Sequence, residues 1–225
     1  MSTVDERAGY WDDFAARVVE RRGEESDEEA LRTAFGWSQY PGHGPGAELL
    51  GEPSNALELG FGRGAAVAAL ALNGVRATGI DLSPVHCEQA RSRWGHLPGV
   101  RFEEAEAVAF LTDQDTEWDA VYGSWGAIWF TDPEVLLPAV RRRLAPGGRL
   151  VFSHAPPVPG CYGMQGMYAG GFKGDRTPIR SWAYEPDQWE AILAGHGFVG
   201  AHAYVVPAPH PDHVGTLIVQ ARQPG

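Results

Sequence analysis

The chain has 225 residues, of which 44% are hydrophobic, and this length suits one α/β domain around a single large core. Its formal charge of −11 argues against a phosphate backbone as the partner, so we expect no nucleic acid. The longest apolar run, Ala65 to Leu72, falls short of the roughly 20 residues of a membrane helix, and no secretory signal opens the sequence. We therefore expect a cytoplasmic protein without a membrane partner.

The two cysteines, Cys87 and Cys161, lie far apart and outside any metal-ligand spacing. We expect neither a disulfide framework nor a bound metal.

Residues 1–53 precede the first predicted strand and are rich in aromatic side chains. The apolar spacing from Tyr10 to Arg22 predicts a helix, and Ser26 followed by Glu29 is typical of a capping box that starts a second one. We expect these helices to form an N-terminal lid over a catalytic domain of residues 54–225, with a single structural domain overall. The aromatic residues either cover a ligand or pack against the sheet edge.

Three glycines, Gly60, Gly62 and Gly64, lie between a predicted strand at residues 56–59 and a predicted helix at residues 65–72. Glycine tolerates positive φ and lets a ligand approach the backbone, while a helix N-terminus offers free N–H donors. A second apolar run ends at Asp81, near the distance at which a βαβ unit delivers an acid to ribose hydroxyls. The turn also fits the dinucleotide fingerprint, with Ala65 as its third small residue, so two nucleotide cofactors stay open.

Three later segments bear on that choice. An acid follows a third predicted strand, with Glu106 preferred and Glu104 as the fallback. A fourth strand covers residues 118–122, and a Pro-Gly-Gly turn at residues 146–148 leads into a fifth. With these motifs in order, residues 54–155 resemble the class I S-adenosylmethionine-dependent methyltransferases.

The resemblance implies roles for individual residues. Glu58 and the backbone at Gly60, Gly62 and Gly64 would hold the methionine end of S-adenosylmethionine. Asp81 would accept the ribose hydroxyls, with Leu82 against the adenine. The remaining cofactor contacts would come from the lid, the adenine-side acid and the pocket floor: Tyr10, Trp11, Glu106, Ala107 and Ser124.

The segment from Pro156 to Phe172 is predicted to be a long glycine-rich, aromatic loop after strand five. Open α/β sheets bind their variable ligands at the carboxyl ends of strands, so we place the acceptor pocket there. The aromatic residues expected to contact the acceptor are Trp37, Trp125, Trp129, Tyr162 and Tyr168.

A helix from Glu185 to His196 is followed by strands at residues 198–206 and 214–221. In the fold that the resemblance implies, these two strands form an antiparallel hairpin that closes the sheet. We therefore expect an α/β fold with a seven-stranded, mostly parallel, doubly wound sheet of order 3-2-1-4-5-7-6.

A base is needed only if the acceptor arrives protonated, and histidine is the natural choice near neutral pH. His154, directly after strand five, is the first candidate, and His43 in the lid loop is the second. An ordinary hydrogen-bonded histidine at a strand end is the alternative for His154. Residues 122–125, Tyr-Gly-Ser-Trp, lack the signatures of three other methyltransferase classes. These are the Pro-Pro-Tyr segment of enzymes that methylate amino groups of DNA bases, the Pro-Cys pair of enzymes that methylate cytosine carbon, and the clustered acids of metal-dependent catechol-type enzymes.

The sequence thus predicts a metal-independent methyltransferase for a small, hydrophobic or planar molecule of bacterial secondary metabolism, such as antibiotic biosynthesis. The acceptor atom stays open among O, N, S and C, and the protein is expected to be a monomer or homodimer. Two alternatives remain: an NAD(P)-dependent oxidoreductase, against which no Tyr-x-x-x-Lys pair is present, and a non-catalytic cofactor-binding regulator.

Overall fold

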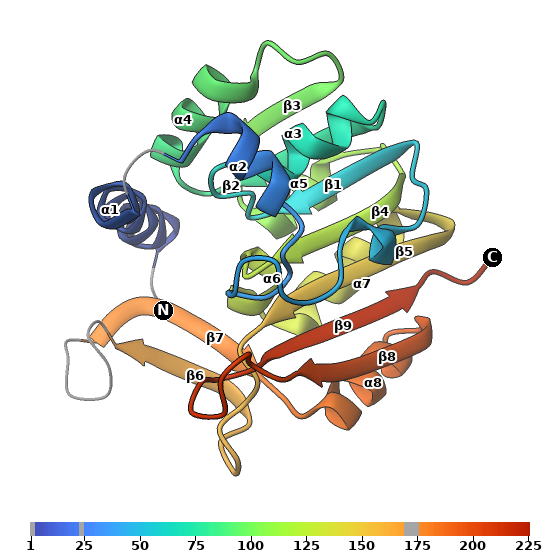
Figure 1. Cartoon of the computed structure of the whole chain (residues 1–225). Coiled ribbons are helices and arrows are strands. Elements are labelled where there is room, and N and C mark those ends of the chain that lie inside the picture. The colour runs from blue at the N-terminus through green and yellow to red at the C-terminus, as the bar shows by residue number, and fades with distance from the viewer. Residues whose placement is uncertain (1–2, 23–24, 169–175) are drawn as a thin grey trace.

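The computed structural model describes residues 3–22, 25–168 and 176–225, with residues 18–22 described by their backbone alone (Figure 1). Its centre is a seven-stranded sheet of order β3-β2-β1-β4-β5-β9-β8. The strands are β1 Asn55–Leu59, β2 Arg76–Asp81, β3 Val100–Glu104, β4 Trp118–Ser124, β5 Leu144–His154, β8 Val199–Val206 and β9 Thr216–Arg222. The first five are parallel, and β9 runs antiparallel to both β5 and β8. The expected fold class and strand order are confirmed.

Helices cover both faces of this sheet, as expected for a doubly wound fold. They are α1 Val4–Arg22, α2 Asp27–Thr33, α3 Ala65–Leu72, α4 Pro84–Trp94, α5 Ala107–Asp113, α6 Ala127–Phe130, α7 Pro133–Arg143 and α8 Pro186–Gly195, with a 3-10 helix η1 at Ala47–Leu50. One core contains buried residues of α5, α7 and α8, and the other contains those of α2, α3 and α4. No helix among the described residues is long and apolar enough to cross a membrane.

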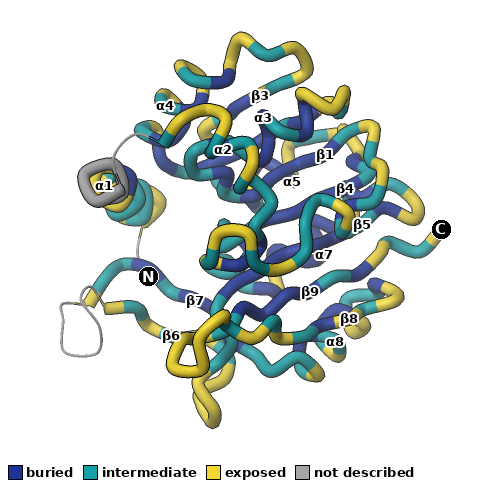
Figure 2. The backbone as a smooth tube through the Cα atoms, viewed as in Figure 1, coloured by how far each residue is buried: buried dark blue, intermediate teal, exposed yellow. Residues whose placement is uncertain are grey.

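Strand β1 shows why two cores form. Leu57 and Leu59 pack into the first core, whereas Ala56 packs into the second. Successive side chains of a strand point to opposite faces, so a strand that is buried on both sides must be apolar throughout. Figure 2 shows this as dark blue tube along the central strands. Both sheet faces are therefore occupied, and a ligand must bind at the strand ends.

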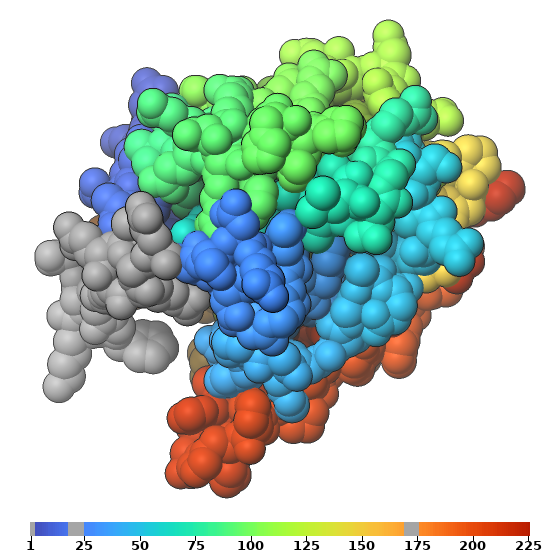
Figure 3. All heavy atoms as spheres, turned by 45° about the horizontal axis from the view of Figure 1, so that its top comes forward, coloured from blue at the N-terminus to red at the C-terminus, as the bar shows by residue number. Residues whose placement is uncertain are grey.

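The expected N-terminal lid separates into two parts. Helix α1 stands beside the carboxyl ends of the parallel strands, where it contacts α4 and the later strand β7 (Figure 1). Residues from α2 to η1 instead pack onto the sheet, and Trp37, only 1% exposed, lies in the second core. Figure 3 shows this second part, in lighter blue, filling the surface between the green α3–α4 region and the red-orange β8–β9 connection.

Of the two reciprocal hydrogen bonds of the capping box predicted for α2, the structure shows one. Ser26 is the N-cap residue, and its Oγ accepts a hydrogen bond from the Glu29 N–H at 3.2 Å. The Glu29 carboxylate is used differently, because it pairs with the Arg32 guanidinium one turn later.

Residues 163–168 of the predicted loop after β5 instead form a β-strand. Strands β6 Gly163–Tyr168 and β7 Arg176–Ala183 form a separate antiparallel two-stranded sheet. The part of the predicted loop at residues 169–172 lies outside the described residues. An isolated two-stranded sheet is barely stable, so this hairpin depends on docking against α1 and α6. The glycines of β6 conceal the alternation that would have predicted a strand.

Candidate active site

A cavity of about 480 Å³ opens at the carboxyl ends of β1, β2 and β4, between α1 and β7. All of the predicted cofactor residues except Gly64 line it. They are Tyr10, Trp11, Glu58, Gly60, Gly62, Asp81, Leu82, Glu106, Ala107 and Ser124. The structure thus brings residues from five separate segments to one place, and their role in binding stays a prediction.

The three glycines of the turn after β1 have φ values of +84°, +53° and +74°, but each meets a different requirement. A Cβ on Gly60 would lie 2.5 Å from the Ala127 nitrogen, and one on Gly64 would lie 2.7 Å from the Phe102 ring. A Cβ on Gly62 would meet no atom within 4 Å. Gly60 and Gly64 are therefore needed for packing, whereas Gly62 keeps its backbone open toward the cavity.

Asp81 is 8% exposed and is held by two backbone donors. Its Oδ2 accepts from the Gly62 N–H at 2.9 Å, and its Oδ1 accepts from the Ser83 N–H at 2.9 Å. His86 Nδ1 lies 3.5 Å from Oδ1. A carboxylate has about four lone-pair sites, so Asp81 can still accept hydrogen bonds from a ligand in the cavity.

Glu58 is only 4% exposed, at the end of β1. Burial raises the pKa of its carboxyl well above the ordinary value, the Tyr122 hydroxyl opposes this by donating a hydrogen bond at 3.3 Å, and the Asp81 charge adds to the rise. Burial likewise raises the pKa of the Tyr122 hydroxyl. A buried carboxyl with a single protein donor retains the capacity to bind a cationic ligand group.

The acid after β3 that reaches the cavity is Glu106. Its side chain caps α5 by accepting from the Ala109 N–H at 2.9 Å, and both Glu106 and Ala107 line the cavity. Glu104, the fallback candidate, is exposed and does not line it.

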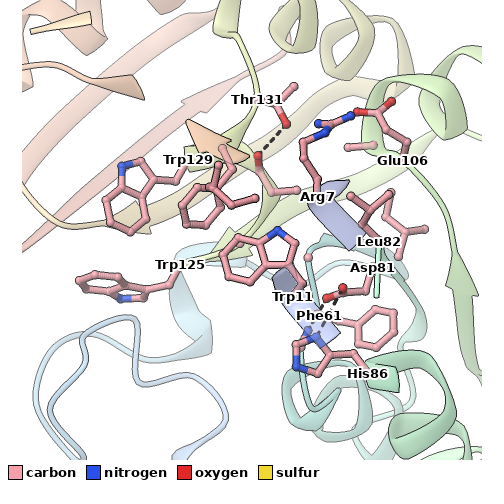
Figure 4. Close-up of a pocket in the computed structure, with 18 of the residues that line it drawn as sticks. Arg7, Trp11, Phe61, Asp81, Leu82, His86, Glu106, Trp125, Trp129 and Thr131 are labelled. Atoms are coloured by element: carbon pink, nitrogen blue, oxygen red, sulfur yellow. Dashed lines mark hydrogen bonds and ion pairs between the residues drawn. The ribbon is translucent and has the colours of Figure 1, made fainter. Parts of the chain in front are cut away.

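The other half of the cavity is aromatic and apolar. Figure 4 shows Trp125 and Trp129 on the side of the cavity away from Asp81 and His86, with Trp11 between the two sides. Further lining residues here come from α1, α6 and the β6–β7 hairpin: Phe14, Phe130, Thr131, Met167, Ile179 and Arg180. We refer to this region, with the three tryptophans, as the aromatic half.

Trp125 is the one non-glycine residue with positive φ, at +54°, among the described residues. Its N–H donates to the Ser153 carbonyl and its indole Nε1–H donates to the Trp37 carbonyl, both at 2.9 Å. Strained backbone conformations persist only where surrounding contacts impose them, and they cluster at functional sites. These two bonds fix the Trp125 ring as a wall of the cavity.

His154 does not line the cavity. It is fully buried, its Nδ1–H donates to the Ala155 carbonyl at 2.7 Å, and its Nε2 has no partner. The ring stacks on Trp129, with 5.5 Å between centroids, and burial lowers the pKa of His154 to about 4. The structure places this imidazole behind the Trp129 ring and outside the cavity lining, a position that argues against its role as the base.

His43 is also remote from the cavity. Its Nε2–H donates to the Pro207 carbonyl at 2.6 Å and joins the lid loop to the β8–β9 connection.

Three of the residues predicted to contact the acceptor also lie away from the cavity. Trp37 is in the core, the Tyr162 hydroxyl donates to Glu185 at 3.0 Å, and Tyr168 is 44% exposed at the end of β6. None of these three residues lines the cavity, whereas Trp125 and Trp129 do.

The sequence interpretation missed the contributions of Arg7, His86, Met167, Ile179 and Arg180 to the cavity. Met167 lay within the predicted acceptor loop, so its region was identified but not its orientation. Arg180 had no local signal because the hairpin that carries it was not predicted.

Asp12 joins helix α1 to the segment after Asp81 by hydrogen bonds. Asp12 Oδ1 accepts a hydrogen bond from the Ser83 hydroxyl at 2.5 Å, with the Val85 N–H at 3.4 Å. Ser83 is also the N-cap of α4, so α1 is connected to the segment that follows Asp81.

Comparisons with known proteins agree with this geometry. The family described as "Methyltransferase domain" matches residues 56–148. The demethylmenaquinone methyltransferase of Thermus thermophilus is 32% identical over 183 residues, covering 72% of this chain and 82% of that protein. The trans-aconitate 2-methyltransferase of Paracidovorax citrulli is 34% identical over 103 residues, covering 45% of this chain but only 38% of that protein.

A solved structure shares the fold over nearly the whole chain. The 1,6-didemethyltoxoflavin-N1-methyltransferase of Burkholderia thailandensis, solved with 1,6-didemethyltoxoflavin and S-adenosylhomocysteine bound, has a TM-score of 0.64. It is 21% identical, with 100% of this chain and 92% of that chain covered, and at this identity the likeness concerns the fold. From the family match and the Thermus relative, the chain belongs to the class I S-adenosylmethionine-dependent methyltransferases.

Proposed function

We propose that this protein transfers the methyl group of S-adenosylmethionine to a small, planar or hydrophobic molecule. The observation that carries the proposal is the single cavity that joins the predicted cofactor residues to the aromatic half. We extend the proposal to a role in bacterial secondary metabolism and to a cytoplasmic location. The amino-acid composition supports both.

The residues present suit the cofactor. Its ribose hydroxyls, adenine amine and methionine ammonium are hydrogen-bond donors, and the cavity offers them acceptors in Asp81, Glu106 and Glu58. Gly62 leaves open space beside the turn, and Leu82 and Ala107 supply apolar surface for a base. S-adenosylmethionine supplies an activated methyl group when bound.

The chain's own part is to position the acceptor and exclude water. Orientation alone contributes roughly 7–11 kcal/mol to barrier lowering in well-aligned reactions. Trp125, held by two hydrogen bonds, and Trp129, stacked on His154, are rigid walls suited to orient a planar acceptor.

Two measurements test the proposal. Isothermal titration should show S-adenosylhomocysteine binding without NAD binding, and the reverse result would refute it in favour of an oxidoreductase. Labelled methyl incorporation into bacterial metabolite extracts should then occur with the wild type and be lost with Asp81→Ala. Cofactor binding without any incorporation would instead indicate a binding protein that does not turn over.

A further inference from the structure

Arg180 brings a positive charge to the aromatic half of the cavity, and it forms no ion pair with any residue that the structure describes. Arg180, on β7, is partly buried and lines both this half and the neighbouring groove, which Glu6 and Asp13 also line. Among the described residues the Arg180 guanidinium makes one hydrogen bond, from Nη1 to the thioether sulfur of Met164 at 3.4 Å, and thioether sulfur is a weak acceptor. No carboxylate of the described residues lies within 4.0 Å of its guanidinium.

The acids of the cavity are engaged at the other end. Asp81 accepts from two backbone N–H groups, Glu106 caps α5, and Glu58 accepts from Tyr122. In a chain with 29 acidic and 18 basic side chains, a partly buried arginine without an acid needs an explanation. Burying an unpaired charge is costly, and a guanidinium matches carboxylate and phosphate geometry in particular.

The hairpin gives Arg180 room to meet a ligand. Gly166 stands directly across from it in the β6–β7 register, and a Cβ there would meet no atom within 4 Å. Helix α6, which carries Trp129 and Phe130, packs against β7. Arg180 therefore faces no side chain at its own register position; among the described residues its guanidinium hydrogen-bonds only to Met164 of β6, and its strand packs against the helix that carries Trp129.

A second arginine, Arg7 of α1, lines the same cavity, and its Nε is buried without a hydrogen-bond partner. In Figure 4 its guanidinium lies on the side of Glu106, so it serves the opposite end of the cavity from Trp125. We assign the acceptor contact to Arg180 alone.

We propose that the acceptor carries an oxyanion group, a carboxylate or a phosphate, and that Arg180 binds it while the tryptophans hold its planar body. This inference rests on the proposed function and adds the substrate class. An aromatic enclosure can also bind a cation, but the guanidinium at this end would repel an ammonium group.

Four one-ring probes of nearly equal size separate these possibilities: benzoate, phenyl phosphate, neutral benzamide and cationic benzamidine. Dissociation constants are measured by ligand-observed NMR on protein saturated with S-adenosylhomocysteine. We expect benzoate or phenyl phosphate to bind at least about tenfold more tightly than benzamide, as the loss of one charge-assisted hydrogen bond predicts. The preferred anion shows which oxyanion the site accepts. Equal binding of benzoate, phenyl phosphate and benzamide, or preference for benzamidine, would overturn the inference.

Variants of β7 locate the effect. Arg180→Gln should abolish the preference for the anion, and Arg180→Lys should retain part of it because the charge remains while the planar fork is lost. Arg176→Gln is the matched control, since Arg176 lies four residues earlier on the same strand and lines only the neighbouring groove. Loss of the preference in Arg176→Gln but not in Arg180→Gln would refute the assignment.

Affinity for S-adenosylhomocysteine is measured on every variant. Unchanged affinity shows that the site is folded. If the wild type fails to bind S-adenosylhomocysteine, the proposed function fails, whereas normal cofactor binding without anion preference overturns only the assignment of the substrate class.

Discussion

The carboxylate of Asp81 accepts a hydrogen bond from the backbone N–H of Gly62, with 2.9 Å between Oδ2 and nitrogen. The acid at the end of β2 is thus hydrogen-bonded to the glycine turn after β1. One residue connects the two parts of the site that the sequence placed separately, and its substitution should affect both.

Replacing Asp81 by Ala should weaken S-adenosylhomocysteine binding by about 1.5–3 kcal/mol, which corresponds to the charge-assisted hydrogen bonds lost. Isothermal titration measures this change directly. Asp119→Ala, which removes a carboxylate bonded to Ser54 and Asn55 at the opposite end of β1, is a control that should leave cofactor affinity unchanged. If the Asp81→Ala protein keeps wild-type affinity, Asp81 is not the residue that accepts the ribose hydroxyls.

Gly62→Ala and Gly64→Ala should separate ligand binding from folding. Both alanines would adopt positive φ, at a cost of roughly 1 kcal/mol each. Only Gly64→Ala adds a clash, with the Phe102 ring at 2.7 Å, so its urea midpoint should fall much further. Similar midpoints for the two variants would contradict this assignment of their roles.

Helix α1 should loosen when Asp12 is replaced by Ala, because this removes the acceptor for the Ser83 hydroxyl. We expect faster amide hydrogen exchange in α1 and faster cofactor release, with little change in global stability, since α1 contributes few residues to the cores. Asp13→Ala, on the exposed side of the same helix, is the control. Equal exchange rates in the wild type and Asp12→Ala would show that α1 is held by other contacts.

His154 should make stability depend on pH without acting as a base. Burial lowers its pKa in the folded protein to about 4, below the ordinary histidine pKa of 6.5, so the unfolded chain binds the proton first. Its stabilising contribution is therefore complete above pH 6.5 and is lost as the pH falls toward 4. The free energy of unfolding should drop by about 2 kcal/mol between pH 7 and pH 5 from this group.

Urea denaturation of His154→Phe at both pH values tests this, because that variant should lack this part of the pH dependence. His202→Phe, which removes a histidine whose side chain is 63% exposed, should behave like the wild type. If His154→Phe keeps the full pH dependence, the histidine is not buried as the structure shows.

The motifs of the sequence predicted the residues placed on the βα turns, and its resemblance to the class I methyltransferases predicted the sheet order. Glu58, Gly62, Asp81 and Glu106 each lie within three residues of the carboxyl end of a parallel strand, and a strand and its turn place such residues at the same sheet edge whatever packs around them. Local spacing was therefore sufficient to predict that they would lie together.

Only the tertiary structure decided which other side chains reach the cavity. Trp37 and Trp125 are both aromatic residues near glycines, yet packing buries one in the core and holds the other at the cavity. His154 ends its strand facing a closed aromatic stack, and Arg180 reaches the cavity through a hairpin stable only when docked on α1 and α6. These outcomes depend on contacts between segments far apart in the chain. Local propensity and periodicity carry no information about such contacts.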